Sequence, residues 1–329
     1  MKTEKILMVW DNLGDYHRAR AKAVEQVNGK GTVITADVGA QDILYEWENP
    51  ERPGHYVLSK LPVSQRDIYN RVVNFIKLVR AEKVTSVFFG GYGSKGYLFF
   101  VLACKLMGIK AFLSLEVWWR TNKLYHIILG TYFRTMFKGV LMAGSRVMNH
   151  YLYKVKLPAQ MIRMPYSVVD NRHFASGTRS EQAKPVLLCV ARFRGHKNLL
   201  PLIEAFGKSG LAGNWELKIV GGGPMKEELE RAASKIPGIT VTKWLSYEQM
   251  PNLFASSDFF ILPSLPESWG LVVNEAMAAG LPIAVSNQTG CMDDFIRPET
   301  GFSFDASSGD EILDTLNKIA SLGKGERKK

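Results

Sequence analysis

The chain has 329 residues, of which 46% are hydrophobic and 22% are charged, a composition that excludes disordered and fibrous proteins. At this length we expect two domains, each large enough to bury its own core. The net charge of +11 comes from the N-terminal half, since residues 1–166 hold 24 Lys/Arg against 12 Asp/Glu and residues 167–329 hold 18 against 19.

Membrane spans and disulfide frameworks are not expected. The longest apolar segment, residues 97–107, is interrupted by Lys105 and is shorter than the roughly 20 residues that a bilayer requires. The first residues lead into an apolar strand without a signal-peptide pattern, so we expect a cytoplasmic protein. The three cysteines are widely spaced among apolar neighbours and are predicted to be buried free thiols: Cys104, Cys189 and Cys291.

Short aliphatic or β-branched runs alternate with helical periodicity, which is typical of α/β proteins with parallel sheets and crossover helices. The predicted strands of the first half are 6–10, 32–36, 84–89, 110–115 and 140–143, and those of the second half are 186–190, 216–220, 239–241, 258–262 and 283–285. Residues 165–185 show neither period. We therefore predict two Rossmann-like domains, 1–166 and 167–329.

The loop after the first strand, residues 11–18, contains Gly14, Asp15 and His17. Asp15 and His17 are candidate residues of a ligand cleft, and Asp15 is equally well explained as a cap of the following helix. Glu116 follows the strand 110–115. A carboxylate at a strand end favours a ligand contact, and an ion pair with a base such as Arg120 is the alternative.

The third predicted strand is followed by Gly91, Gly93 and Gly96 in the pattern G-x-G-x-x-G, with Glu116 twenty residues beyond. This is the fingerprint of dinucleotide binding, so an NAD(P)-dependent oxidoreductase is the alternative function. Against this function, the pattern follows an interior strand. An oxidoreductase would also leave the polar residues between Arg192 and Glu275 without a role.

Residues 117–163 carry eight Lys/Arg and no acid, interleaved with aromatic residues. Such a segment suits contact with an anionic membrane surface, and the alternative is that the aromatics are core and the cations are solvated. No nucleic-acid-binding pattern accompanies it.

Two segments of the second half carry the chemistry. In residues 189–198, Arg192 and Lys197 flank a Gly-containing turn, where two cations can clamp a diphosphate. In residues 266–282, Gly270 precedes a short helix whose first amides, those of Leu271 and Val272, are suited to bind an anion.

Two carboxylates flank this predicted anion-binding helix start: Glu267 lies on the loop before it, and Glu275 lies within the helix. They are placed to accept hydrogen bonds from hydroxyl groups of one ligand. The alternative for each segment is an ordinary solvated turn or helix surface.

Together the two segments resemble the family-4 retaining glycosyltransferases, also called glycosyl transferases group 1. In that family a Glu-x7-Glu motif, here Glu267 to Glu275, is followed by an Ala/Gly-rich helix end and Gly-x-Pro. Residues 161–174, 217–224, 250–258 and 300–302 are similar to further elements of the family. The resemblance is close over about residues 160–321 and loose over the N-terminal half.

The resemblance implies the GT-B fold, with parallel sheets facing across an interdomain cleft, an acceptor domain at 1–166 and a nucleotide-sugar domain at 167–329. It implies that Arg192 and Lys197 bind the donor diphosphate, and that Gly270, Leu271 and Val272 supply amides. Further donor contacts are implied for Gly14, for Glu267 with the sugar, for Glu275 with the ribose, and for Trp244 and Leu245 with the base. Trp244 as a core aromatic is the alternative. Glu116 stands where many members have His.

The expected reaction is retaining transfer from a UDP-sugar or GDP-sugar to a saccharide or lipid-linked hydroxyl acceptor, in polysaccharide or glycoconjugate synthesis. Glu267, Glu116, Arg192 and Lys197 are the candidate catalytic residues. Because the two cations and the helix amides would stabilise the leaving diphosphate, we expect no cofactor and no metal ion.

Overall fold

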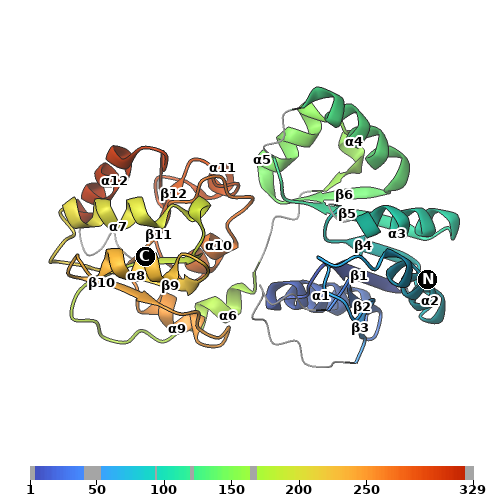
Figure 1. Cartoon of the computed structure of the whole chain (residues 1–329), viewed down its shortest axis with the longest axis horizontal. Helices are drawn as coiled ribbons and strands as arrows, with labels where there is room; N and C mark the ends of the chain where they lie inside the picture. The colour runs from blue at the N-terminus through green and yellow to red at the C-terminus, as the bar shows by residue number, and fades with distance from the viewer. Residues whose placement is uncertain (1–3, 41–52, 93–94, 119–121, 164–168, 323–329) are drawn as a thin grey trace. The chain divides into compact units, whose positions relative to one another are not determined.

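The structure is a computed structural model that describes residues 4–40, 53–92, 95–118, 122–163 and 169–322 (Figure 1). It divides into two compact units, Met1–Val168 and Val169–Lys329, whereas the sequence places the boundary after residue 166.

The first unit is built on a seven-stranded parallel sheet in the order β3-β2-β1-β4-β5-β6-β7. Its strands are β1 (Ile6–Trp10), β2 (Val33–Asp37), β3 (His55–Val57), β4 (Ser86–Phe89), β5 (Lys110–Leu115), β6 (Gly139–Met142) and β7 (Ile162–Arg163). Its helices are α1 (Asp15–Asn28), α2 (Ile68–Ala81), α3 (Lys95–Leu106), α4 (Lys123–Met136) and α5 (Gly144–Asn149), with short helical turns at His150–Lys154 and Ala159–Met161.

Aromatic rings hold the helices of the first unit to its sheet. Phe75 of α2 stacks on Phe100 of α3, with ring centroids 4.7 Å apart. Phe89 of β4 meets Tyr97 of α3 edge to face at 5.8 Å. One side of α3 is therefore fixed in the core.

The second unit has a six-stranded parallel sheet in the order β10-β9-β8-β11-β12-β13. Its strands are β8 (Val186–Arg192), β9 (Glu216–Gly222), β10 (Ile239–Thr242), β11 (Phe259–Leu262), β12 (Ile283–Ser286) and β13 (Gly301–Phe304). Its helices are α6 (Asn171–Ala175), α7 (Leu199–Lys208), α8 (Lys226–Ala233), α9 (Met250–Ala255), α10 (Leu271–Ala278), α11 (Met292–Phe295) and α12 (Gly309–Ser321), with a helical turn at Gly195–Lys197.

The main core of the second unit lies between one face of this sheet and the helices α7, α8 and α12. Alternate residues of the strands face these helices, as Leu187 and Cys189 of β8 and Leu217 of β9 do. Strands β11 and β12 are buried along their whole length, which accounts for their continuous apolar sequences.

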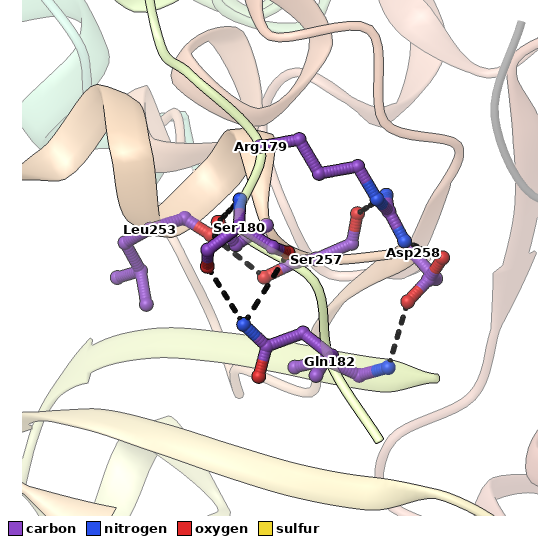
Figure 2. A network of polar contacts seen from close by, with 8 residues as sticks. Arg179, Ser180, Gln182, Leu253, Ser257 and Asp258 are labelled. Carbon is purple, nitrogen blue, oxygen red and sulfur yellow. Dashed lines mark hydrogen bonds and ion pairs between the residues drawn. The ribbon is translucent and has the colours of Figure 1, made fainter. Parts of the chain in front are cut away.

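The segment before β8 is tied to the second unit by polar contacts (Figure 2). Arg179 donates to the Ser257 carbonyl at 3.2 Å and forms an ion pair with Asp258 at 2.8 Å. The other carboxylate oxygen of Asp258 accepts from the Val186 amide at 2.9 Å. A Cβ added at Gly177 would lie 2.1 Å from the Pro251 carbonyl oxygen, so only glycine fits at this approach.

All ten predicted strands are present within one or two residues of their predicted ends, and β3, β7 and β13 are additional. Residues 165–185 show no helical period in the sequence, yet they include the short helix α6. The side chain of Asp170 caps this helix by accepting from the amides of Arg172 and His173. Five residues are too few to show a helical period in the sequence.

The three cysteines are buried free thiols, as predicted. Within the described ranges no helix is long and apolar enough to cross a bilayer. The same ranges contain no cluster of three His, Cys, Asp or Glu side chains arranged to hold a metal ion.

Candidate functional site

The candidate site lies at the carboxyl edge of the second sheet, where loops from β8 and β11 meet. These strands are neighbours in the sheet, so the residues that follow them share one edge. The amide of Leu265, after β11, donates to the His196 carbonyl, after β8, at 2.6 Å. In open α/β sheets such an edge is the usual place for ligands.

Lys197 and Glu267 form an ion pair across these two loops. Lys197 ends the helical turn Gly195–Lys197, and Glu267 lies between β11 and α10. The two side chains are 14% and 17% exposed, so the pair is shielded from bulk water but still reachable. The sequence predicts both residues for one ligand but gives no sign that they contact each other.

The turn that carries Lys197 is held in place from both sides. Asn198 adopts a left-handed conformation with φ of 56°, and its side chain donates to the Ala306 carbonyl at 2.6 Å. Arg192 is the last residue of β8 and pairs in register with Gly222 of β9. The cation at the strand end and the cation on the turn are therefore both carried by hydrogen-bonded backbone.

A second loop, residues 288–291, braces the backbone of Glu267. The Glu267 amide donates to the Gln288 carbonyl at 3.0 Å, and the Gly290 amide donates to the Glu267 carbonyl at 3.0 Å. A Cβ at Gly290 would lie 1.9 Å from the Ser268 carbonyl oxygen, so the close pairing needs glycine here. Nothing local in the sequence predicts this brace, since Gly290 lies four residues beyond the end of β12.

Helix α10 begins at Leu271, directly after Gly270, as predicted. Gly270 has a φ of 91°, and a Cβ there would lie 2.9 Å from the Thr289 methyl group. The preceding Trp269 is buried, donates to the Asn274 side chain at 2.8 Å and packs against Phe295. This anchor fixes the start of the helix, where the amides of Leu271 and Val272 stand before the first intrahelical bond.

Glu275 lies on α10 and is half-buried. Burial raises the pKa of its carboxyl group to about 7. Near neutral pH the group is therefore divided between a protonated form that donates a hydrogen bond and an ionised form that only accepts.

Trp244 lies after the edge strand β10 and is 38% exposed, so its interpretation as a core aromatic is wrong. Its indole lies beside Gly222, because a Cβ added to Gly222 would be 3.0 Å from Trp244 Cδ1. Leu245 is half-buried. The ring is thus accessible at the carboxyl end of β9, on the same edge as Arg192, and its predicted contact with a base stays a prediction.

In the first unit Gly14, not Asp15, occupies the N-cap position of α1, so the interpretation of Asp15 as the cap is wrong. The Gly14 amide donates to Nδ1 of His17 at 3.0 Å. His17 is buried and stacks on Trp10 with ring centroids 4.6 Å apart, and burial lowers its pKa well below the ordinary value. His17 thus stabilises the loop as a neutral ring.

Glu116 directly follows β5, and its carboxylate lies 3.9 Å from the guanidinium of Arg20 on α1. The alternative partner considered from the sequence, Arg120, is outside the described residues. Of the G-x-G-x-x-G pattern, Gly93 is also outside them. Gly91 has open space at its Cβ position and Gly96 makes only an ordinary contact. At neither position does a close backbone approach require glycine.

The basic segment 117–163 is divided between core and surface. Phe133, Phe137 and Tyr151 are buried, and Arg146 lies 4.7 Å from the ring centre of Trp118. Tyr153 is exposed. Most described aromatics of this segment are therefore engaged within the protein, as the alternative interpretation holds.

The family model described as "Glycosyl transferases group 1" matches residues 171–329. The sulfoquinovosyl transferase SQD2 of Arabidopsis thaliana is 31% identical over 179 residues, 50% of this chain and 33% of that protein. A GDP-mannose-dependent alpha-(1-6)-phosphatidylinositol monomannoside mannosyltransferase of Mycolicibacterium smegmatis is 29% identical over 147 residues, 41% of this chain and 38% of that protein. The match thus spans less than two fifths of either relative.

Solved structures are similar to the chain over nearly its whole length. HepE of Anabaena, in complex with UDP and glucose, matches 98% of this chain and 91% of that chain with a TM-score of 0.75 at 14% identity. WaaG, a glycosyltransferase involved in lipopolysaccharide biosynthesis, matches 98% and 92% with a TM-score of 0.69 at 15% identity. The predicted GT-B fold, with two parallel-sheet α/β domains, is confirmed. None of these comparisons supports the oxidoreductase alternative.

Proposed function

Residues 171–329 form a domain of the glycosyl transferases group 1 family, and from this premise we propose that the chain transfers a glycosyl group from a nucleoside-diphosphate sugar to a hydroxyl acceptor. The observation that carries the proposal is the Lys197–Glu267 ion pair at the start of α10. It joins a cation suited to a phosphate and a carboxylate suited to sugar hydroxyls at one helix N-terminus.

The diphosphate binds between Arg192, Lys197 and the first amides of α10 in this proposal. As the bond to the sugar breaks, negative charge moves onto the leaving diphosphate, and fixed cations and amides stabilise it without reorganisation. These groups do the work that a divalent cation does in other enzymes, so we propose a metal-independent reaction without a cofactor. The donor is a UDP-sugar or a GDP-sugar.

Because Lys197 and Glu267 contact each other before the donor binds, their contacts change in a definite order during binding. The diphosphate carries more charge than one carboxylate and attracts Lys197 away from Glu267. The released carboxylate then accepts hydrogen bonds from hydroxyls of the transferred sugar. Glu275, farther along the helix, holds the ribose hydroxyls.

Transfer proceeds with retention at the anomeric carbon in this proposal, with the leaving phosphate assisting deprotonation of the acceptor on the same face. The first unit supplies the acceptor side with Glu116 and Arg20, and Gly14 adds a further contact to the donor. The mannosyltransferase relative acts on a phosphatidylinositol monomannoside and WaaG takes part in lipopolysaccharide biosynthesis, which supports a saccharide or lipid-linked acceptor here. We place the chain in the cytoplasm, at the inner face of the membrane, in polysaccharide or glycoconjugate synthesis.

A thermal-shift panel tests the proposal. UDP-, GDP-, ADP- and TDP-sugars are compared with NAD and NADP at equal concentrations. One nucleotide-sugar should raise the melting temperature, since a ligand that binds only the folded state stabilises it by mass action. Stabilisation by a dinucleotide alone would overturn the proposal.

A further inference from the structure

Helices α3 and α4 present exposed apolar side chains on their outer faces. Seven large apolar residues, each 40–80% exposed, make up what we term the α3–α4 face: Leu98, Phe99, Leu102, Leu106, Leu124, Ile127 and Ile128. The other exposed large apolar residues among the described ones are scattered singly over other elements. Exposed apolar residues that gather on adjoining helices mark a binding surface, whereas single ones need no explanation.

The two helices form one continuous surface. They contact each other, and Lys105 of α3 donates to the Thr135 carbonyl of α4 at 3.3 Å. Their inner sides are already filled, as the buried Phe100 and Phe133 show. The outer apolar residues are therefore not needed for the core of this unit.

The polar groups on the outer face of α4 are satisfied within the helix. The hydroxyl of Thr131 donates to the Ile127 carbonyl at 2.9 Å, and that of Thr135 donates to the Thr131 carbonyl at 2.9 Å. Neither hydroxyl needs water as a partner. This surface can therefore leave water without stranding these donors.

The charge around the face favours one occupant. Residues 83–169 contain twelve Lys/Arg and one acid, Glu116. Lys105, Lys123, Arg134 and Lys138 are exposed on or next to the two helices. A second copy of the chain would bring like charges together, whereas an anionic lipid surface complements both the apolar residues and the cations.

We propose that the α3–α4 face docks on an anionic lipid bilayer, with the two helices lying in the membrane interface. This goes beyond the basic segment 117–163, because α3 lies outside that segment and supplies four of the seven apolar contacts. The purpose of this contact, which is to bring the enzyme to a lipid-linked acceptor, rests on the proposed function. The contact itself forms without a donor.

Co-sedimentation with vesicles tests the contact. Wild-type protein is mixed with phosphatidylcholine vesicles with and without phosphatidylglycerol, at low and high salt. The variants are Leu106→Glu and Ile127→Glu, and the matched control is Val27→Glu on α1, which makes the same change at an exposed apolar residue away from the face. Nucleotide-sugar thermal shifts are measured for every variant, so loss of lipid binding is separated from loss of the donor site.

Wild type and Val27→Glu should bind only the anionic vesicles, and more weakly at high salt. Leu106→Glu and Ile127→Glu should each lower the partition coefficient at least about tenfold, since each removes an apolar contact and adds a repelled charge. Their thermal shifts should be unchanged. Failure of wild type to bind anionic vesicles at low salt, or equal binding by the face variants, would overturn the proposal. A dimer in sedimentation equilibrium that both face variants dissociate would assign the face to a second copy instead.

Discussion

The ammonium group of Lys197 and the carboxylate of Glu267 form an ion pair that joins the loop after β8 to the loop after β11. The two residues are 70 positions apart in the chain, and the parallel pairing of β8 with β11 brings them together. In the proposed reaction this pair opens when the donor diphosphate binds.

Replacement of Lys197 by alanine removes one diphosphate contact. We expect kcat/KM to fall about thirtyfold, which corresponds to about 2 kcal/mol for one charge-assisted hydrogen bond. Steady-state rates with the donor found in the thermal-shift panel measure the effect. The control is Lys226→Ala, because Lys226 pairs with Glu230 on the exposed surface of α8. Activity of Lys197→Ala within a factor of two of wild type, with an intact fold, would refute the clamp.

Glu275 predicts a pH dependence of stability. In the folded protein its carboxyl group keeps a proton up to a pKa of about 7, whereas in the unfolded chain it loses the proton near 4.5. Between these values the folded state binds more protons, so the contribution of Glu275 to stability decreases as pH rises through this window and is constant above it.

Thermal melts between pH 4 and pH 8 test this sign. The variant Glu275→Gln should melt like wild type at the acid end and at a higher temperature than wild type at the alkaline end. Glu204→Gln, at an exposed position on α7, is the matched control and should show no such difference. Parallel curves for wild type and Glu275→Gln would show that burial does not control this carboxyl group.

The backbone conformation of Gly270 predicts that a larger residue at the start of α10 lowers the stability of the protein. Alanine at φ of 91° is strained, and its Cβ would approach the Thr289 methyl group to 2.9 Å. We expect Gly270→Ala to lose about 1–3 kcal/mol of folding free energy and to weaken donor binding, since the helix amides are displaced. The control is Gly309→Ala, which has open space at the first position of α12. Urea unfolding that gives equal stability for both variants would contradict the assigned strain.

The sequence predicts the strands and the bounds of α10 well for a physical reason. Fully buried parallel strands such as β8 and β11 need continuous apolar runs, and the end of α10 is fixed by Gly280 followed by Pro282. Both signals are local. The short strands β3 and β7 carry too few residues to show a period, so they could not be predicted.

Contacts between distant segments could not be predicted from the sequence. The brace of Glu267 by residues 288–291 and the approach of Arg20 to Glu116 depend on which strands are neighbours. The α3–α4 face could not be predicted from the sequence for another reason. Residues 97–107 are apolar on both sides of α3, and composition alone does not distinguish the side that faces the core from the side that faces out.

The most direct test of the account is calorimetric titration of Glu267→Gln and Glu275→Gln with a nucleoside diphosphate and with the matching nucleotide-sugar, alongside initial rates. Glu275→Gln should weaken both ligands, because the ribose is common to them. Glu267→Gln should leave the affinity for the nucleoside diphosphate nearly unchanged and lower kcat, because a sugar contact that strengthens in the transition state is lost. If Glu267→Gln loses nucleotide affinity and Glu275→Gln does not, or if both variants bind and turn over like wild type, the proposed placement of the donor along α10 is contradicted.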